Sequence, residues 1–179
     1  MKIMSRLQDV NTHDIRGAIE LGCGTMSRVF NADDNDVPFF AATAWPEAWM
    51  GFCDWATEAH VPGRHLNALL AAKEAIGFEP EASVIEKHAR AALFSFGGSA
   101  AVPLNRRDDP QGPLVRFHSH NLREGLLALH ALIRLGRPDP AVGLMKRCIE
   151  TIQTYFDPER GLQVQPMAER FGRLIRMRR

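Results

Sequence analysis

The sequence HNLREGLLALHALIRLGRPDPAVGLMKRCIETIQTYFDPERGL, residues 120–162, carries the clearest structural signal in the chain. Apolar residues recur every three or four positions, which is the spacing that places them on one face of a helix. Asn121 followed three residues later by Glu124 matches a capping box. The Gly and Asp-Pro residues of 136–140 separate this helix from a second one, which ends at the turn 157–161. The stretch therefore predicts a helical hairpin.

The rest of the chain shows the same helical spacing. We expect five further helices and no paired strands, so the predicted class is all-α, in a single domain over residues 1–179. The breaker Val61-Pro62-Gly63 is expected to separate two of the helices, and the proline- and glycine-containing residues 97–116 to form an irregular loop. The expected helices cover about residues 12–29, 45–60, 66–76, 80–93 and 167–179.

Composition bounds the class of protein. With 179 residues, of which 45% are hydrophobic and 24% charged, the chain is long enough for one globular core. A formal net charge of +1 argues against a general nucleic-acid binder, because such proteins carry a basic excess. The three cysteines are widely spaced, which indicates reduced thiols instead of a disulfide framework. No apolar run has the length of a signal peptide or a membrane span, so we expect a cytoplasmic protein without membrane binding.

The residues from Phe117 to Leu162 resemble the hairpins of the alpha/alpha toroid, or six-hairpin, carbohydrate-active enzymes. In those hairpins, a helix of leucine and small residues leads through a Gly/Asp/Pro turn into a second helix, which ends in an aromatic residue and an Asp-Pro turn. The resemblance implies a ring of hairpins whose loops at one end form a cup for a saccharide. A full toroid has about twice the helices expected here, so the chain resembles half a ring: a fragment, a shortened product or a subunit. Uncovered helix faces predict self-association.

The loop FNADDNDVPFF, residues 30–40, holds Asp33, Asp34 and Asp36 between aromatic side chains. An EF-hand needs glycine at its sixth position and glutamate at its twelfth, where this sequence has Asp36 and Ala42, so an EF-hand is excluded and only a different calcium geometry stays open. Crowded carboxylates beside aromatic walls can supply the protonated and the ionised acid of a glycosidase. The alternative is a capped turn whose aromatic residues fill the core.

The sequence VRFHSHN, residues 115–121, places Arg116, His118 and His120 on one side if it is extended, because side chains alternate in a strand. Such a row suits a carboxylate or a hydroxyl-rich ligand, with the histidines as proton donors. The His-x-His pair can also bind zinc, but a catalytic zinc needs a third protein ligand. By composition alone, the candidates for that ligand are His60, His65 and Glu58. The alternative is that both histidines hydrogen-bond the start of the following helix.

A third cluster, TEAHVPGRHLN, residues 57–67, surrounds the Pro-Gly break. Arg64, His65 and Asn67 can orient hydroxyl groups or a uronate there, and Trp45 can supply a stacking face for a sugar. The alternative is a helix-helix turn in which the arginine covers apolar surface.

These patterns lead to one leading hypothesis: a carbohydrate-active protein, either a glycoside hydrolase or a polysaccharide lyase, that uses carboxylate and histidine acid-base chemistry. Its expected partners are a saccharide or uronate-containing substrate and a second copy of the chain, with no cofactor and no metal ion. The alternative is a noncatalytic helical interaction module or an inactive truncated toroid. Convergence of the loops at Asp33, His65 and His118 on one concave face would favour the enzyme.

Overall fold

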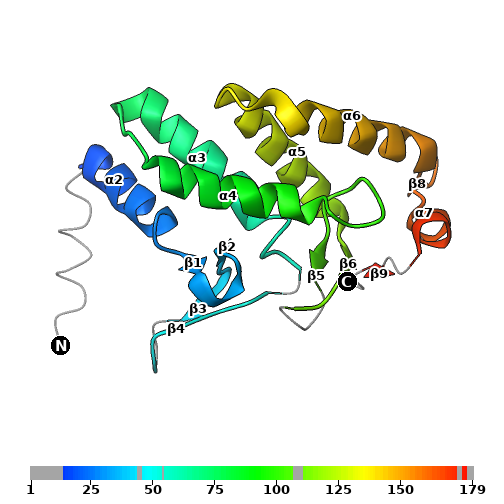
Figure 1. The fold of residues 1–179 in the computed structure, drawn as a ribbon, viewed down its shortest axis with the longest axis horizontal. Helices are drawn as coiled ribbons and strands as arrows, with labels where there is room; N and C mark the ends of the chain where they lie inside the picture. Colours follow the sequence, from blue (N-terminus) through cyan, green and yellow to red (C-terminus); the bar gives the residue numbers. More distant parts are fainter. Residues whose placement is uncertain (1–13, 44–45, 54, 107–110, 173–174, 177–179) are drawn as a thin grey trace.

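The computed structural model describes residues 14–43, 46–53, 55–106, 111–172 and 175–176 (Figure 1). The described residues are mostly helical, as the sequence predicts, and none of their helices is both long and apolar enough to cross a membrane. The helices are α2 (Ile15–Met26), a short 3-10 helix (Ala32–Asp34), α3 (Val61–Ile76), α4 (Ala82–Ser95), α5 (Ser119–Arg134), α6 (Pro138–Tyr155) and α7 (Val164–Phe171).

Short strands pair between the helices, so the expectation of no paired strands is wrong. Each strand has two to four residues, which is too short for an alternating pattern to show in the sequence. Three sheets are antiparallel pairs, and in the fourth β6 pairs antiparallel with β5 and parallel with β9. The strands are β1 (Phe30–Asn31), β2 (Val37–Pro38), β3 (Ala41–Thr43), β4 (Trp49–Gly51), β5 (Asn105–Arg106), β6 (Leu114–Phe117), β7 (Phe156–Asp157), β8 (Gly161–Leu162) and β9 (Ile175–Arg176).

The helix expected over residues 45–60 is wrong. Strand β4 pairs with β3, with Trp49 opposite Thr43, and residues 55–60 form turns. Aromatic residues favour strands as well as helices, so the apolar spacing of this segment fits a hairpin equally well.

Two other helix boundaries differ from the expectation. Helix α3 begins at Val61, so Val61-Pro62-Gly63 starts a helix instead of separating two, because proline is favoured in a first turn. The last helix starts earlier than expected and ends at Phe171, and residues 175–176 pair with β6 as a strand. The irregular loop expected over residues 97–116 contains β5 and most of β6.

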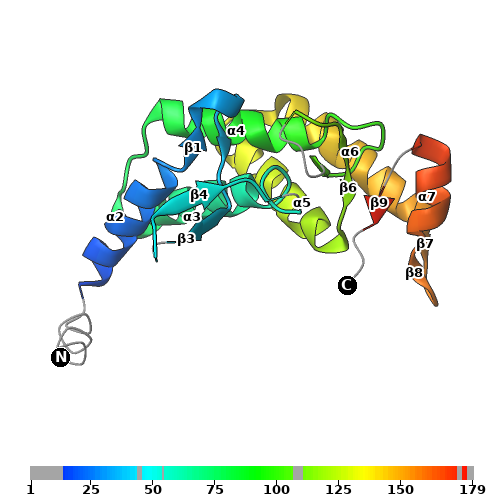
Figure 2. The same ribbon diagram turned by 90° about the horizontal axis from the view of Figure 1, so that it is seen from below.

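Helices α3 and α5 run parallel to each other along the centre of the molecule. Hydrogen bonds join pairs of residues that are 60 positions apart in the sequence, and these pairs occur along the whole length of both helices. They are Arg64 with Glu124, Asn67 with Leu127, and Glu74 with Arg134. A constant separation in sequence means that the two helices lie side by side in the same direction. Helices α4 and α6 each run back after a short turn, so the chain alternates in direction from helix to helix (Figures 1 and 2).

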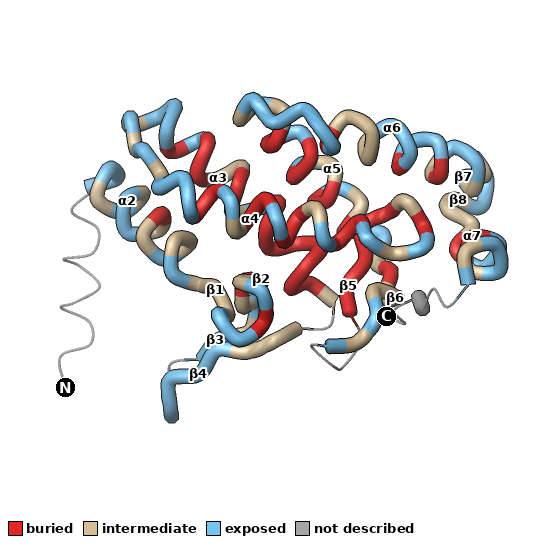
Figure 3. Tube along the Cα trace, in the orientation of Figure 1, coloured by how far each residue is buried: buried red, intermediate tan, exposed pale blue. Residues whose placement is uncertain are grey.

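The core lies where α3, α4 and α5 meet (Figure 3). Leu66 and Leu69 from α3 and Leu129 and Leu132 from α5 are almost completely buried, together with Phe117 at the end of β6. Strands β1 to β6 lie beyond the ends at which α3 and α5 begin (Figure 1). The loops that could hold a ligand are therefore carried by the N-terminal ends of the two best-packed helices.

Gly63 allows the close approach of α3 and α5, because a Cβ atom there would lie 2.3 Å from the backbone oxygen of Glu124. We expect Gly63→Ala to lower the free energy of unfolding by about 1–3 kcal/mol, the usual cost of overpacking, since a backbone atom cannot move aside alone. Gly22→Ala in α2 is the matched control: its Cβ would meet nothing within 4 Å, and we expect it to stabilise by about 0.5–1 kcal/mol. Urea denaturation measures both variants. Equal effects at the two positions would contradict the close contact.

Candidate functional site

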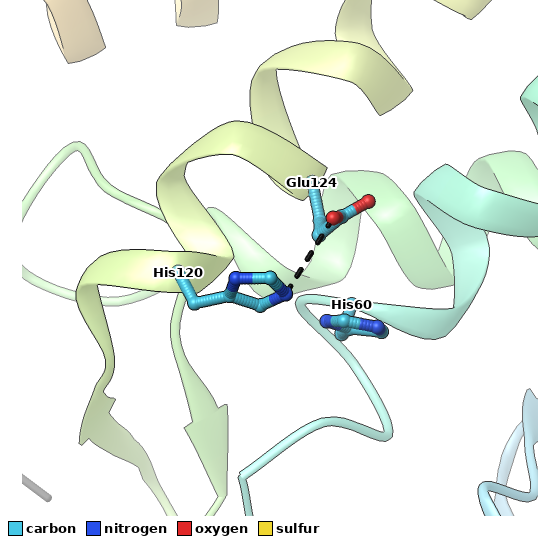
Figure 4. A group of neighbouring side chains, drawn as sticks. All are labelled: His60, His120 and Glu124. Atoms are coloured by element: carbon cyan, nitrogen blue, oxygen red, sulfur yellow. Dashed lines mark ion pairs between the residues drawn. The ribbon is translucent and has the colours of Figure 1, made fainter.

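The parallel packing of α3 and α5 brings two histidines and a glutamate together. His60 directly precedes α3, His120 lies in the first turn of α5, and Glu124 follows one turn later on the same face (Figure 4). The two imidazole rings stack with centroids 5.0 Å apart and planes 24° apart. His120 Nε2 lies 3.6 Å from Glu124 Oε1, and one nitrogen or oxygen atom from each residue lies within 4.8 Å of the other two. We call these residues the His60–His120–Glu124 cluster.

Two asparagines hold the turns that carry His60. Asn121 Nδ2 on α5 donates to the backbone oxygen of Trp55 at 2.8 Å. Asn105 Oδ1 on β5 accepts the backbone N–H groups of Glu58 at 3.1 Å and Ala59 at 3.0 Å. The segment before α3 is therefore fixed to α5 on one side and to β5 on the other.

Glu124 is buried and surrounded by cations. Its Oε1 accepts from Arg64 Nη2 at 3.2 Å and from Arg123 Nε at 2.9 Å, while its side chain is only 3% exposed. Burial alone would raise the pKa of Glu124, but the hydrogen bond from Arg123 and the charge of Arg64 lower it below the ordinary value. Glu124 is therefore the ionised carboxylate of the cluster.

His60 is a buried imidazole among aromatic rings. Phe40 and Trp55 meet it edge-on, with ring centroids 6.0 and 6.2 Å away. Burial lowers the pKa of His60. The negative charge of Glu124 raises this pKa in part, and the positive charge of Arg64 lowers it further. Its Nδ1 is buried and has no hydrogen-bond partner among the described residues. His60 is therefore neutral near pH 7 and can accept a proton or a ligand.

A cavity of about 510 Å³ opens beside His60. Its wall combines apolar side chains with the polar groups of His60, Arg64 and His65, and the guanidinium side chain is 53% exposed. Burial, together with the charge of His60, lowers the pKa of His65 to about 4. The apolar part of the wall comes from Val29, Phe39, Phe40, Ala41, Ala42, Met50 and Val61.

The acidic loop contributes Phe39 and Phe40 to this cavity, whereas the carboxylates of Asp34 and Asp36 are paired elsewhere. Asp36 pairs with Lys87 at 3.0 Å and Arg90 at 2.9 Å, and the hydrogen bond from Lys87 lowers the pKa of Asp36 despite partial burial. Asp33 is exposed on the short 3-10 helix. Asp34 lines a second cavity of about 430 Å³ that shares no lining residue with the first.

Arg106 on β5 holds Asp34 in a buried network. Its Nη1 and Nη2 donate to the two oxygens of Asp34 at 2.9 and 2.6 Å, and its Nε donates to Glu58. Phe52 and Phe94 lie against the guanidinium, 5.2 and 5.6 Å from ring centroid to Cζ. All three charged residues are 5% exposed or less, so the network fastens the acidic loop to β5 and to the segment before α3.

Glu58 is a buried carboxyl group that the sequence indicated only as a possible zinc ligand, not as a catalytic acid. Burial raises its pKa to about 7, although Arg106 acts in the opposite direction. Its Oε2 is buried with no hydrogen-bond partner in the part of the chain that the structure describes. Arg106 also binds Asp34, and its charge offsets the burial of Glu58 only in part.

The N-cap of α5 is His118, whose Nδ1 accepts the backbone N–H of His120 at 3.1 Å. This is the helix-start role that the sequence offered as the alternative for the two histidines. The predicted capping box of Asn121 and Glu124 is wrong, because the helix begins two residues before Asn121. Both side chains then lie inside the helix and serve the site.

The remaining predicted residues are spread around the site. Asn67 Nδ2 donates to the backbone oxygens of Gly63 at 2.7 Å and Leu127 at 3.0 Å, so it joins α3 to α5. Arg116 lies half-buried on β6, opposite Asn105 in the register of that pair. Trp45 lies outside the described residues.

The sequence did not indicate Glu124 as a site residue. It offered His60 as a zinc ligand by composition alone and as one of the residues around the Pro-Gly break that could face a ligand. One signal was present: His120 and Glu124 are four residues apart and therefore share a helix face. Comparisons of the chain with models of protein families, with curated proteins and with solved structures found no match.

The raised pKa of Glu58 predicts how stability depends on pH. Between pH of about 4.5 and 7 the folded protein binds more protons at Glu58 than the unfolded chain, so its stability falls as pH rises through this window. We expect Glu58→Gln to remove this decline and to stabilise the protein at pH 8 by about 1–3 kcal/mol relative to the native sequence. Thermal or urea unfolding at pH 5, 6, 7 and 8 measures it.

Glu86→Gln is the control, since Glu86 is an exposed partner of Arg137. A Glu58→Gln variant with the same pH slope as the native chain would show that Glu58 ionises normally.

Proposed function

We propose that this chain is a carbohydrate-active protein, built as part of an α/α toroid, that binds an acidic saccharide in the cavity at the start of α3, beside the His60–His120–Glu124 cluster. The observation that carries the proposal is the composition of the cavity wall. Phe39, Phe40 and Met50 form an apolar surface, while Arg64 and His65 present polar groups beside them. A sugar ring needs this combination, because its C–H face packs on aromatic rings and its oxygens require hydrogen bonds.

The helix arrangement supports the toroid part of the proposal. Parallel α3 and α5, each followed by a helix that runs back, repeat one hairpin twice along the chain. The resemblance to a toroid implies that the loops at one end of the hairpins form the cup. The cavity lies at that end here, since His60 and Arg64 belong to the start of α3.

The charge of the site favours a saccharide that bears a carboxylate. The start of α3 lines the cavity, and the start of α5 lies beside it through the stacked rings of His60 and His120. Helix N-termini attract anions. Arg64 and Arg123 add two positive charges against the single carboxylate of Glu124. A uronate can bind the exposed guanidinium of Arg64 in a bidentate manner.

Of the two proposed reactions, a lyase reaction fits these residues better than hydrolysis. A glycosidase needs a protonated and an ionised acid at the sugar, but Asp34 and Asp36 are paired with arginine and lysine. In β-elimination, a base removes the proton from the carbon beside the carboxylate, a carbon–carbon double bond forms, and the bond to the leaving sugar oxygen breaks, with a proton passing to that oxygen. His60 and His65 line the cavity and are the candidate proton acceptors, and Arg64 would neutralise the carboxylate.

A panel of neutral and uronate-containing oligosaccharides tests the proposal, read by calorimetric binding and by the ultraviolet absorbance of an unsaturated product. We expect a preference for uronates, and we expect Arg64→Ala to weaken uronate binding about 10- to 100-fold by removing a charged hydrogen bond. Arg137→Ala is the matched control, because Arg137 pairs with Glu86 away from the cavity, and it should change nothing.

The outcomes separate the two hypotheses. Binding with formation of the unsaturated product supports the lyase, and binding without turnover supports an incomplete or inactive toroid. The absence of binding to every saccharide would overturn the proposal and favour the noncatalytic interaction module. The exposed Phe40, Trp49 and Met50 at β3 and β4 would then be the first surface to test for a partner.

A further inference from the structure

We infer that His60, His120 and Glu124 form a binding site for one divalent transition-metal ion, for which Zn²⁺ is the best match. The sequence predicted no metal, but it offered zinc as an alternative for the pair His118 and His120, with His60, His65 or Glu58 as a third ligand by composition alone. In the structure His118 caps α5, and the carboxylate of Glu124 joins His120 and His60 instead. The inference concerns metal binding alone and does not depend on saccharide binding.

The distances fit ligands of a single ion. One ligand atom of each residue lies within 4.8 Å of the other two, and His120 Nε2 lies 3.6 Å from Glu124 Oε1. This separation is beyond ordinary hydrogen-bond length. Tetrahedral zinc with bonds of about 2.0–2.1 Å holds neighbouring ligand atoms about 3.3–3.5 Å apart. Closing the site around an ion requires a shift of about an ångström in two side chains. It also requires rotation of the stacked rings of His60 and His120, because a metal ion lies in the plane of each imidazole that binds it.

The ligand types select the class of ion. Two imidazoles and one carboxylate are the protein ligands of many catalytic zinc sites, in which the fourth position is left for water or substrate. Calcium and magnesium prefer oxygen ligands throughout, so two imidazoles select against them. His60 also lines the 510 Å³ cavity, so the fourth position can face the space in which a ligand would bind.

The surrounding hydrogen bonds hold the ligands in place. Asn121 and Asn105 fix the turns before α3, and His118 fixes the first turn of α5 through the N–H of His120. Such supporting bonds orient metal ligands in known sites. The buried Nδ1 of His60, without a hydrogen-bond partner among the described residues, shows that this ring has unused binding capacity.

The guanidinium groups of Arg64 and Arg123 oppose a cation, because both donate to the carboxylate that the ion would use. Their side chains are 53% and 58% exposed, so both can turn into solvent when an ion binds. This competition has a definite sign: removing an arginine should strengthen metal binding. If the cluster were an anion site only, removing an arginine would instead leave the affinity for metal unchanged and weaken the affinity for anions.

The first experiment titrates Zn²⁺ and Co²⁺ into the full chain by calorimetry, after treatment with a chelator and under reducing conditions. We expect one ion per chain and the visible absorption of four- or five-coordinate cobalt, with no thiolate-to-cobalt band from the three cysteines. His120→Ala should weaken binding at least about 100-fold, since loss of a supporting partner alone costs 10–100-fold. His130→Ala is the matched control, because His130 is exposed on the same helix and outside the cluster.

The second experiment measures Zn²⁺ binding by Arg123→Ala and Glu124→Gln. We expect Arg123→Ala to bind zinc more tightly than the native chain and Glu124→Gln to bind it more weakly. Because Glu124 is buried, unfolding curves are recorded without metal to show that each variant is folded, and Zn²⁺ should raise the melting temperature of the native chain but not of His120→Ala. Absence of zinc binding, binding unchanged in His120→Ala, or weaker binding by Arg123→Ala would each overturn the inference.

Discussion

The close parallel contact of α3 and α5 is the constraint on which the site depends. Gly63 leaves room for the backbone oxygen of Glu124. Hydrogen bonds between residues 60 positions apart hold the two helices side by side along their whole length. Because the helices are parallel, their N-termini and the two positive helix dipoles meet at one end. This parallel packing brings His60 and His120 together, although they lie in different hairpins.

A second constraint fixes the loops in front of that contact. Arg106 binds Asp34 with two hydrogen bonds and Glu58 with a third, and the rings of Phe52 and Phe94 lie against its guanidinium. A buried arginine with two carboxylates adds less to stability than its bonds suggest, because all three groups lose water. Its effect is on position: it places the loop with Phe39 and Phe40 against the segment that ends in His60.

The sequence predicted the long helices well and the site only in part. Periodicity located α3, α5 and α6, because each has a long apolar face. It failed at residues 45–60, where aromatic residues form a hairpin, and at Asn121 and Glu124, whose spacing matched a capping box inside a helix that starts earlier. It could not join His60 to Glu124 or Asp34 to Arg106, because these contacts depend on packing between segments that are 64 and 72 residues apart.

Glu124 connects the proposed saccharide site with the inferred metal site. At present its charge is shared between Arg64 and Arg123, which leaves the site with more positive than negative groups. An ion bound to Glu124 would take over that carboxylate and release Arg64, which lies on the cavity wall, to meet a carboxylate of the sugar. The ion would also occupy His60, and His65 would remain as a neutral imidazole on the cavity wall, where its pKa of about 4 makes it a weak base. The two sites would therefore support each other, because the cation frees Arg64 from Glu124 and leaves its guanidinium available to bind the carboxylate of an acidic saccharide.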